Sequence, residues 1–239
     1  MFTGIDIGGT NTDVAVIDSQ ISTYKVPNGE GLDHALMKTS KTGRLAVSTS
    51  QPLNEIITGP PVDIHTITIP GPGLVYAGAV KGAVSHRGDI VEPINPDEIY
   101  QLMRGQHARA IAIAGKFSVR NDIQEKQVYD IVSQFYSDEQ IAISSPLGGL
   151  NFPARIHTTR YNARIKGKVS SLIKQIKKVN PDFYFVTSTG GLISSDRALE
   201  NPMLLFHSSP ATVATGAYYL SKIDDCLVVD IGGTTTELV

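Results

Sequence analysis

The sequence predicts an α/β protein with a partly parallel sheet, and three observations lead to that prediction. Short runs rich in Ile and Val, bounded by Gly, Pro or Asp, recur along the 239 residues and are typical of strands. Segments with helical spacing lie between the later runs, and strands that alternate with helices favour a parallel sheet. The pattern Asp-Ile-Gly-Gly-Thr-x-Thr occurs twice, near the start and near the end of the sequence, which indicates an internal repeat.

The strands are predicted from seven apolar runs. In chain order these cover residues 2–7, 13–18, 64–69, 110–115, 140–144, 183–188 and 226–231. The last run contains Cys226, the one cysteine of the sequence, which we expect to be buried as a small apolar side chain. Residues 26–63 show no clear periodicity apart from a turn at residues 59–61, so no element is predicted there.

Four helices are predicted from capping residues and apolar spacing. They are expected to begin at Asn95-Pro96, at Asn121 or Asp122, near Arg155, and at Ser209-Pro210. The first has the order of a cap, a first-turn proline and an acidic third position. The third is the longest and runs to about residue 178, because apolar residues recur in it at helical spacing. A domain boundary is expected in the Ser-, Pro- and Gly-rich stretch at residues 144–153, which gives a first domain at residues 1–151 and the start of a second at 152–239.

Composition and charge exclude several classes of function. The sequence carries 21 basic and 23 acidic residues, a net charge of −2, so nothing favours a nucleic-acid partner or a membrane surface. No apolar run approaches the roughly 20 residues of a membrane span, and the N-terminus lacks the pattern of a signal peptide. With no disulfide framework, we expect a cytoplasmic protein.

The first copy of the repeated pattern predicts a hairpin rather than a Walker-type phosphate loop. It continues as an alternating run to Asp18, which predicts a strand, whereas a Walker loop opens a helix. Two glycines permit positive φ and a close approach of backbone N–H groups to a ligand, and consecutive N–H groups bind anions. Asp6 and Asp230 end the preceding strands, where a carboxylate holds Mg²⁺ directly or through water. Phosphate groups with their metal ion are therefore the predicted ligand.

The second copy strengthens this interpretation. A single Gly-rich hairpin could be a plain turn, because such turns are common. Two copies at corresponding strand ends favour an internal duplication, which would give two lobes whose hairpins face each other across a cleft.

Paired hairpins of this kind resemble the two phosphate turns of the actin, hexokinase and heat-shock-chaperone ATPase superfamily. Within it, the chain resembles the hydantoinase/oxoprolinase family in four further segments. SHRGDIVEPIN at residues 85–95 is similar to RG-x-V-x-EPL, FSVRNDIQEKQV at 117–128 to FSxxNPxHE, TSTGGLIS at 187–194 to QSNGGLMS, and HSSPATVATGA at 207–217 to LSGPAAGVVGA. The family's HGTTVATNAL is echoed only by AVSTSQPLN at residues 46–54, where its histidine is replaced by Leu45 or Ala46.

The resemblance implies a ribonuclease H-like, actin-type ATPase fold with two lobes, the second of them incomplete. Similar proteins use ATP and Mg²⁺ to open cyclic amides such as hydantoins or 5-oxoproline by phosphorylating the amide oxygen, and others are subunits of ATP-dependent carboxylases. The implied phosphate turns comprise Gly8, Gly9, Thr10, Asn11 and Thr12, and Gly232, Gly233, Thr234, Thr235 and Thr236. Asp6 and Asp230 are the implied metal ligands and catalytic residues. Asp13 is a third catalytic candidate that orients a water or is a solvated strand residue.

Two other segments have a functional and a structural interpretation. Gly190 and Gly191 follow a predicted strand, where open α/β sheets bind ligands, but they also suit a structural turn. Ser208 and Ser209 begin a helix whose N-terminus favours an anion, but they also suit a simple cap.

Only three residues follow the second pattern, whereas the second lobe of the superfamily continues and holds the adenosine. We therefore expect a truncated or naturally short member with weak affinity for ATP. Unpaired strand edges would favour association with a second subunit or a second copy of the chain. Two alternative functions stay open: a small-molecule kinase of the same fold, and a nucleotide-switched subunit without catalysis.

Overall fold

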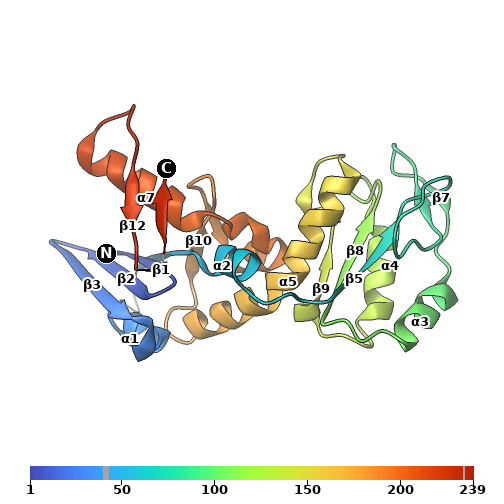
Figure 1. The fold of residues 1–239 in the computed structure, drawn as a ribbon, viewed down its shortest axis with the longest axis horizontal. Helices are drawn as coiled ribbons and strands as arrows, with labels where there is room; N and C mark the ends of the chain where they lie inside the picture. The colour runs from blue at the N-terminus through green and yellow to red at the C-terminus, as the bar shows by residue number, and fades with distance from the viewer. Residues whose placement is uncertain (40–42, 234) are drawn as a thin grey trace. The chain divides into compact units, whose positions relative to one another are not determined.

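The computed structural model describes residues 1–39, 43–233 and 235–239 (Figure 1). The chain divides into two compact units. The first combines Met1–Gly59 with Lys168–Val239, and the second is Pro60–Gly167. Each unit has its own sheet and its own hydrophobic core.

A mixed six-stranded sheet forms the centre of the first unit, in the order β11-β10-β4-β1-β2-β3. Its strands are β1 (Phe2–Ile7), β2 (Asn11–Ile17), β3 (Ile21–Pro27), β4 (Arg44–Thr49), β10 (Phe183–Val186) and β11 (Leu192–Ser194). Strands β1, β4 and β10 run parallel, and the remaining pairs are antiparallel. The strands predicted at residues 2–7, 13–18 and 183–188 are thereby confirmed to within a few residues.

Strand β4 occupies the middle of this sheet although the sequence did not predict it. It pairs with β1 on one side and β10 on the other. Leu45 and Val47 are fully buried in the core with Phe185 and Leu36. Only three consecutive apolar residues mark the strand, since Ser48 and Thr49 at its carboxyl end are buried polar residues, and so short a run carries little periodicity.

Helices and turns lie between the strands of the first unit in the sequence. They are α1 (Leu32–Met37), α2 (Gln51–Ile57), α6 (Ser195–Glu200) and α7 (Ser208–Ser221), with the 3₁₀ turns Asn28–Glu30 and Pro202–Leu205. A two-stranded hairpin of β12 (Val229–Ile231) and β13 (Thr236–Leu238) completes the unit. Cys226 precedes β12 and is exposed, so the prediction that it is buried in a strand is wrong.

The second unit contains a parallel sheet in the order β5-β8-β9. Its elements are β5 (Ile64–Ile69), β6 (Ala83–Val84), β7 (Ile90–Glu92), α3 (Pro96–Arg104), β8 (Ala110–Gly115), α4 (Ile123–Val132) and β9 (Ile141–Ile143), with 3₁₀ turns Asp138–Gln140 and Ser145–Leu147. The predicted cap is confirmed, because the Asn95 side chain accepts a hydrogen bond of 3.2 Å from the backbone N–H of Asp97.

The long helix α5 (Phe152–Lys177) belongs to both units, which meet in sequence at Gly167 and Lys168. The grouping therefore differs from the expected division into residues 1–151 and 152–239. The reason is nonlocal: β10 pairs with β4, which joins the chain after α5 to the N-terminal sheet. The two actin-type lobes stay a prediction. In the part of the chain that the structure describes, no helix is long and apolar enough to cross a membrane.

Candidate phosphate-binding site

The two copies of the repeated pattern form hairpins with the same register. In β1–β2, Asp6 lies opposite Asp13, and in β12–β13, Asp230 lies opposite Glu237. Both hairpins belong to the first unit, and Figure 1 shows the β12–β13 pair beside β1 and β2. The sequence repeat is thus a repeat in three dimensions, with an acidic residue at the end of each first strand.

Each turn is closed in the same way. The backbone N–H of Gly8 donates to the carbonyl of Asn11 at 3.0 Å, and that of Gly232 donates to the carbonyl of Thr235 at 2.9 Å. A Cβ at either glycine would lie 3.0 Å from the same carbonyl oxygen. None of the four described turn glycines is among the residues with positive φ. Gly8 and Gly232 are therefore needed for close approach of the backbone and not for the positive φ that the sequence suggested.

The tips of the two hairpins approach each other closely. A Cβ at Gly233 would lie 2.9 Å from Oγ1 of Thr10, so a larger residue there would push the tips apart. The backbone N–H groups of Gly9 and Gly233 donate to no acceptor among the described residues. Unused N–H groups at two opposed turns suit an anion.

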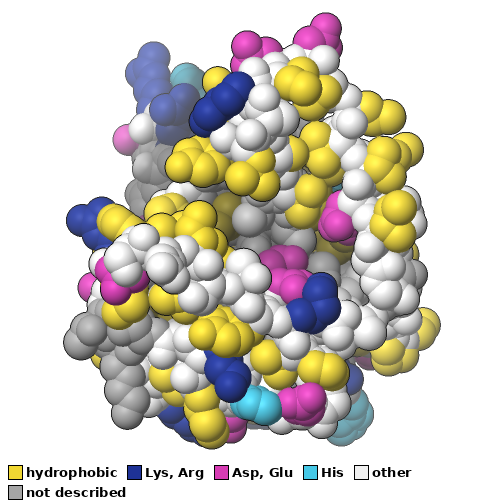
Figure 2. All heavy atoms as spheres, turned by 90° about the vertical axis from the view of Figure 1, so that its left-hand side faces the viewer, with side chains coloured by type: hydrophobic (Ala, Val, Ile, Leu, Met, Phe, Trp, Pro, Cys, Tyr) yellow, Lys and Arg dark blue, Asp and Glu magenta, His cyan; other side chains and the backbone are white. Residues whose placement is uncertain are grey.

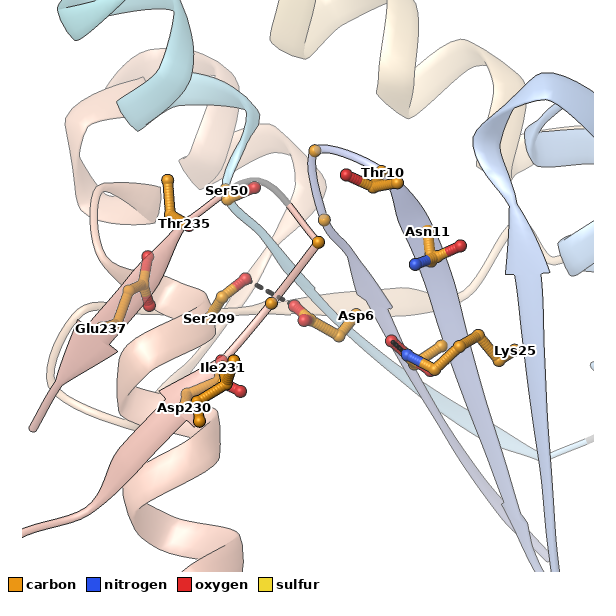
Figure 3. A pocket seen from close by; sticks show the side chains of 15 residues that line it. Asp6, Thr10, Asn11, Lys25, Ser50, Ser209, Asp230, Ile231, Thr235 and Glu237 are labelled. Atoms are coloured by element: carbon orange, nitrogen blue, oxygen red, sulfur yellow. Dashed lines mark hydrogen bonds and ion pairs between the residues drawn. The ribbon is translucent and has the colours of Figure 1, made fainter.

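A cavity of about 140 Å³ lies between the hairpins. It is lined by Asp6, Gly8, Gly9, Thr10, Asn11, Asp13, Lys25, Ser50, Ser209, Asp230, Ile231, Gly232, Gly233, Thr235 and Glu237. Figure 3 shows that Thr10, Asn11 and Lys25 approach from one side, and Thr235 and Glu237 from the other. The face drawn in Figure 2 is hollowed, with acidic side chains gathered in the hollow. A cavity needs only about 10–15 Å³ to hold one water, so this one has room for a group larger than a single water.

The carboxylate of Asp6 is held on one oxygen by two hydroxyl groups. Oδ1 accepts a hydrogen bond of 2.7 Å from Oγ of Ser48 on β4 and one of 2.5 Å from Oγ of Ser209 on α7. Figure 3 shows the bond from Ser209. The side chain of Asp6 is therefore fixed by contacts with two elements that lie far from it in sequence.

Lys25 on β3 brings a positive charge to the cavity. Its Nζ lies 2.8 Å from Oδ1 of Asp13, the residue directly opposite it in the β2–β3 ladder. The pair is about half exposed, so it contributes little to stability. Lys25 was not predicted as a site residue, because its place beside Asp13 depends on the β2–β3 register.

Glu237 also lines the cavity, and its surroundings disfavour the charged form of its carboxyl group. Partial burial and the negative charge of Asp230 raise its pKa, His207 opposes that shift, and Asp6 adds to it. Several carboxylates around one cavity repel one another, and a divalent cation among them would relieve that repulsion.

Some predicted residues lie away from the cavity. Thr12 is buried, and its hydroxyl donates to Asn28, whose side chain in turn donates to the carbonyl of Gly8. Thr12 therefore braces the first hairpin. Thr236 pairs with Ile231 in the ladder and does not line the cavity.

Gly190 and Gly191 form the turn between β10 and β11 and do not line this cavity either. Gly190 has a φ of 77°, and the carbonyl of Gly191 accepts from the N–H of Thr187 at 2.8 Å. Their geometry is that of a structural turn, and a ligand-binding role stays a prediction. Thr234 lies outside the described residues.

The donor set fits Mg²⁺ with phosphate. Carboxylate oxygens are its preferred protein ligands, and Mg²⁺ commonly uses one or two of them together with waters and substrate phosphates. Asp6 and Asp230 supply two such groups in the cavity. Across the described ranges, no three acidic, His or Cys side chains converge closely enough to hold an ion by themselves.

Comparison with solved structures defines the class of fold. Acetone carboxylase, solved without nucleotide, matches with a TM-score of 0.79 at 18% identity. ATP-dependent caprolactamase from Pseudomonas jessenii matches with a TM-score of 0.68 at 20% identity. Each alignment covers 100% of this chain and 43% of the other. The protein thus shares a mixed α/β fold with two ATP-dependent enzymes.

Sequence comparison gives the family. The model of the hydantoinase/oxoprolinase N-terminal region matches residues 75–136, and that of hydantoinase/oxoprolinase matches residues 155–239. An uncharacterized protein of Methanocaldococcus jannaschii is 29% identical over 171 residues, 66% of this chain and 25% of the relative. This chain spans about a quarter of the length of that curated relative. It belongs to the hydantoinase/oxoprolinase family, as its motifs predicted.

Proposed function

We propose that the two hairpins hold the phosphates of one ATP with its Mg²⁺, and that the γ-phosphoryl group is transferred to the oxygen of a cyclic amide of the hydantoin or 5-oxoproline type. The observation that carries the proposal is the pair of hairpins. They come from opposite ends of the chain, have the same register, and line one cavity with their glycines and acidic residues.

The chain supplies positioning and charge, which are what phosphoryl transfer requires. The backbone N–H groups of Gly9 and Gly233, which line the cavity, would supply one donor from each hairpin for the phosphates. Lys25 offsets negative charge on the side of the first hairpin. Mg²⁺, when bound by Asp6 and Asp230, would neutralise charge that develops on the phosphoryl oxygens.

The nature of the acceptor rests on chemistry and on the family. An amide carbonyl is a poor electrophile, and phosphorylation of its oxygen creates a leaving group before water attacks the carbon. The family is described as hydantoinase/oxoprolinase, and one protein of the same fold is by name an ATP-dependent caprolactamase. A cyclic amide is therefore the acceptor that these relatives support.

The test is release of ADP and phosphate from ATP by the purified protein, alone and with hydantoin, 5-oxoproline or glucose. We expect Mg²⁺-dependent hydrolysis that a cyclic amide stimulates at least about tenfold, with one ring-opened product formed per ADP. The amide, once phosphorylated, is consumed, so the two products must match. If glucose stimulates ADP release and a phosphorylated sugar is formed, the protein is a small-molecule kinase and not an amide hydrolase. If none of the three compounds changes the rate of ATP hydrolysis, the proposal is contradicted.

A further inference from the structure

The first turn of α7 is joined to two strands of the sheet by neighbouring serines that do different work. Ser208 and Ser209 are both buried. Oγ of Ser208 accepts from the N–H of Thr49 at 2.9 Å and donates to the carbonyl of the same residue at 3.0 Å. Oγ of Ser209 instead donates to Oδ1 of Asp6 at 2.5 Å. Ser208 thus links α7 to the backbone of β4, whereas Ser209 donates a hydrogen bond to a carboxylate that lines the cavity.

The hydrogen bond from Ser209 to Asp6 determines which carboxylate oxygen of Asp6 can bind a cation. A carboxylate oxygen has two acceptor sites, and on Oδ1 these are occupied by Ser48 and Ser209. Oδ2 accepts no hydrogen bond from the described residues, and Asp6 lines the cavity. The two serines therefore leave one defined oxygen for a cation or for its bound water.

Ser209 is also a departure from the motif that this segment resembles. HSSPATVATGA aligns with LSGPAAGVVGA so that Ser208 matches the motif's serine, while Ser209 stands where the motif has glycine. Glycine has no side chain, so the bond between residues 209 and 6 is a feature of this chain and not of the motif.

We propose that Ser209 is a positioning residue, which orients Asp6 so that Oδ2 faces the divalent cation and thereby raises the affinity for it. The inference rests on the proposed function, because it takes Asp6 as a metal ligand. Hydrogen bonds to charged groups are stronger than neutral ones, and removal of groups that orient a metal ligand commonly costs 10–100-fold in affinity.

The experiment measures binding of Mn²⁺, as the probe for Mg²⁺, by the electron paramagnetic resonance signal of the free ion in the presence of ATP, after subtraction of the Mn²⁺ that the same ATP binds without protein. Ser209→Ala should raise the Kd for Mn²⁺ at least about tenfold. Ser209→Thr keeps the hydroxyl and should restore the affinity to within about threefold of the unaltered protein, as a purely steric role would not.

Ser208→Ala is the matched control, since it removes a buried hydroxyl one residue away whose partner among the described residues is the backbone of Thr49. It should lower the melting temperature, because a hydrogen bond contributes about 1 kcal/mol net to stability. It should leave the Kd for Mn²⁺ within about twofold of the unaltered protein, because the Ser208 hydroxyl bonds to Thr49 and not to Asp6. Equal Kd values for Ser209→Ala and the unaltered protein would overturn the inference alone. Failure of the unaltered protein to bind Mn²⁺ with ATP would overturn the proposed function and the inference with it.

Discussion

Replacing Asp6 by Asn should weaken the binding of Mg²⁺ with ATP by about 100-fold, equivalent to about 2.8 kcal/mol. Asn has the same shape, so the hairpin is kept. It removes the negative charge at the oxygen that Ser48 and Ser209 leave for the cation. It also places a donor where the site needs an acceptor. The Kd is measured by calorimetry at fixed Mg²⁺ with ATP as titrant.

Asp18→Asn is the matched control for that prediction. Asp18 follows β2 at the end remote from the glycine turn and does not line the cavity. Its replacement should leave the Kd unchanged while it makes the same change in net charge. If Asp6→Asn and Asp18→Asn bind ATP with Mg²⁺ equally well, Asp6 is not a ligand of the metal.

The largest effect on stability is expected in the second unit, from Arg155→Met. Arg155 is buried and donates to the carbonyls of Gly115 and Lys116 and to the hydroxyls of Ser118 and Ser144. Burial lowers its pKa, and the negative charge of a second buried residue, Glu125, opposes that shift. Loss of the guanidinium leaves a buried carboxylate without its counter-charge, which should lower the free energy of unfolding by about 3–5 kcal/mol.

Glu125 explains why the loss should be so large. It is fully buried at the carboxyl end of β8 and accepts from the N–H groups of Gly115 and Ser145 at 2.6 and 2.8 Å. Ser144 donates to it and accepts from Arg155, which links the two charges. Adding Glu125→Gln to Arg155→Met removes the orphaned charge, so the double variant should lose less than the sum of the two single changes.

The measurement is urea unfolding followed by circular dichroism. Lys126→Ala is the control on α4, the helix that carries Glu125, since it breaks an exposed pair with Asp122 at 2.9 Å, and it should cost only about 0.3–0.5 kcal/mol. A loss below about 1 kcal/mol for Arg155→Met would mean that the buried network does not hold the second unit together.

How much could be read from the sequence depended on whether the signal was local. The hairpins, their acidic strand ends and the cap at Asn95 were predicted because each is encoded within about seven neighbouring residues. Strand β4 was missed since its pairing with β1 and β10 joins distant parts of the chain. The expected domain boundary differed from the observed units for the same reason.

The candidate site shows the same limit. Lys25 reaches the cavity through the β2–β3 register, and Ser48 reaches Asp6 because β4 runs parallel to β1. Ser209 lies 203 positions from Asp6 and was judged only as a cap or an anion site. Local periodicity and spacing cannot predict contacts between residues so far apart in the sequence. The repeated motif therefore located the site, but the residues that reach it from other elements became known only from the structure.

Both hairpins are proposed to bind the phosphates of a single nucleotide. This is tested most directly by following the backbone amide signals of Gly9 and Gly233 by nuclear magnetic resonance while ATP is added at saturating Mg²⁺. We predict that both signals shift, saturate with the same Kd, and return when the metal is chelated. A shift at one hairpin alone, different Kd values at the two, or no shift at either would contradict the proposal.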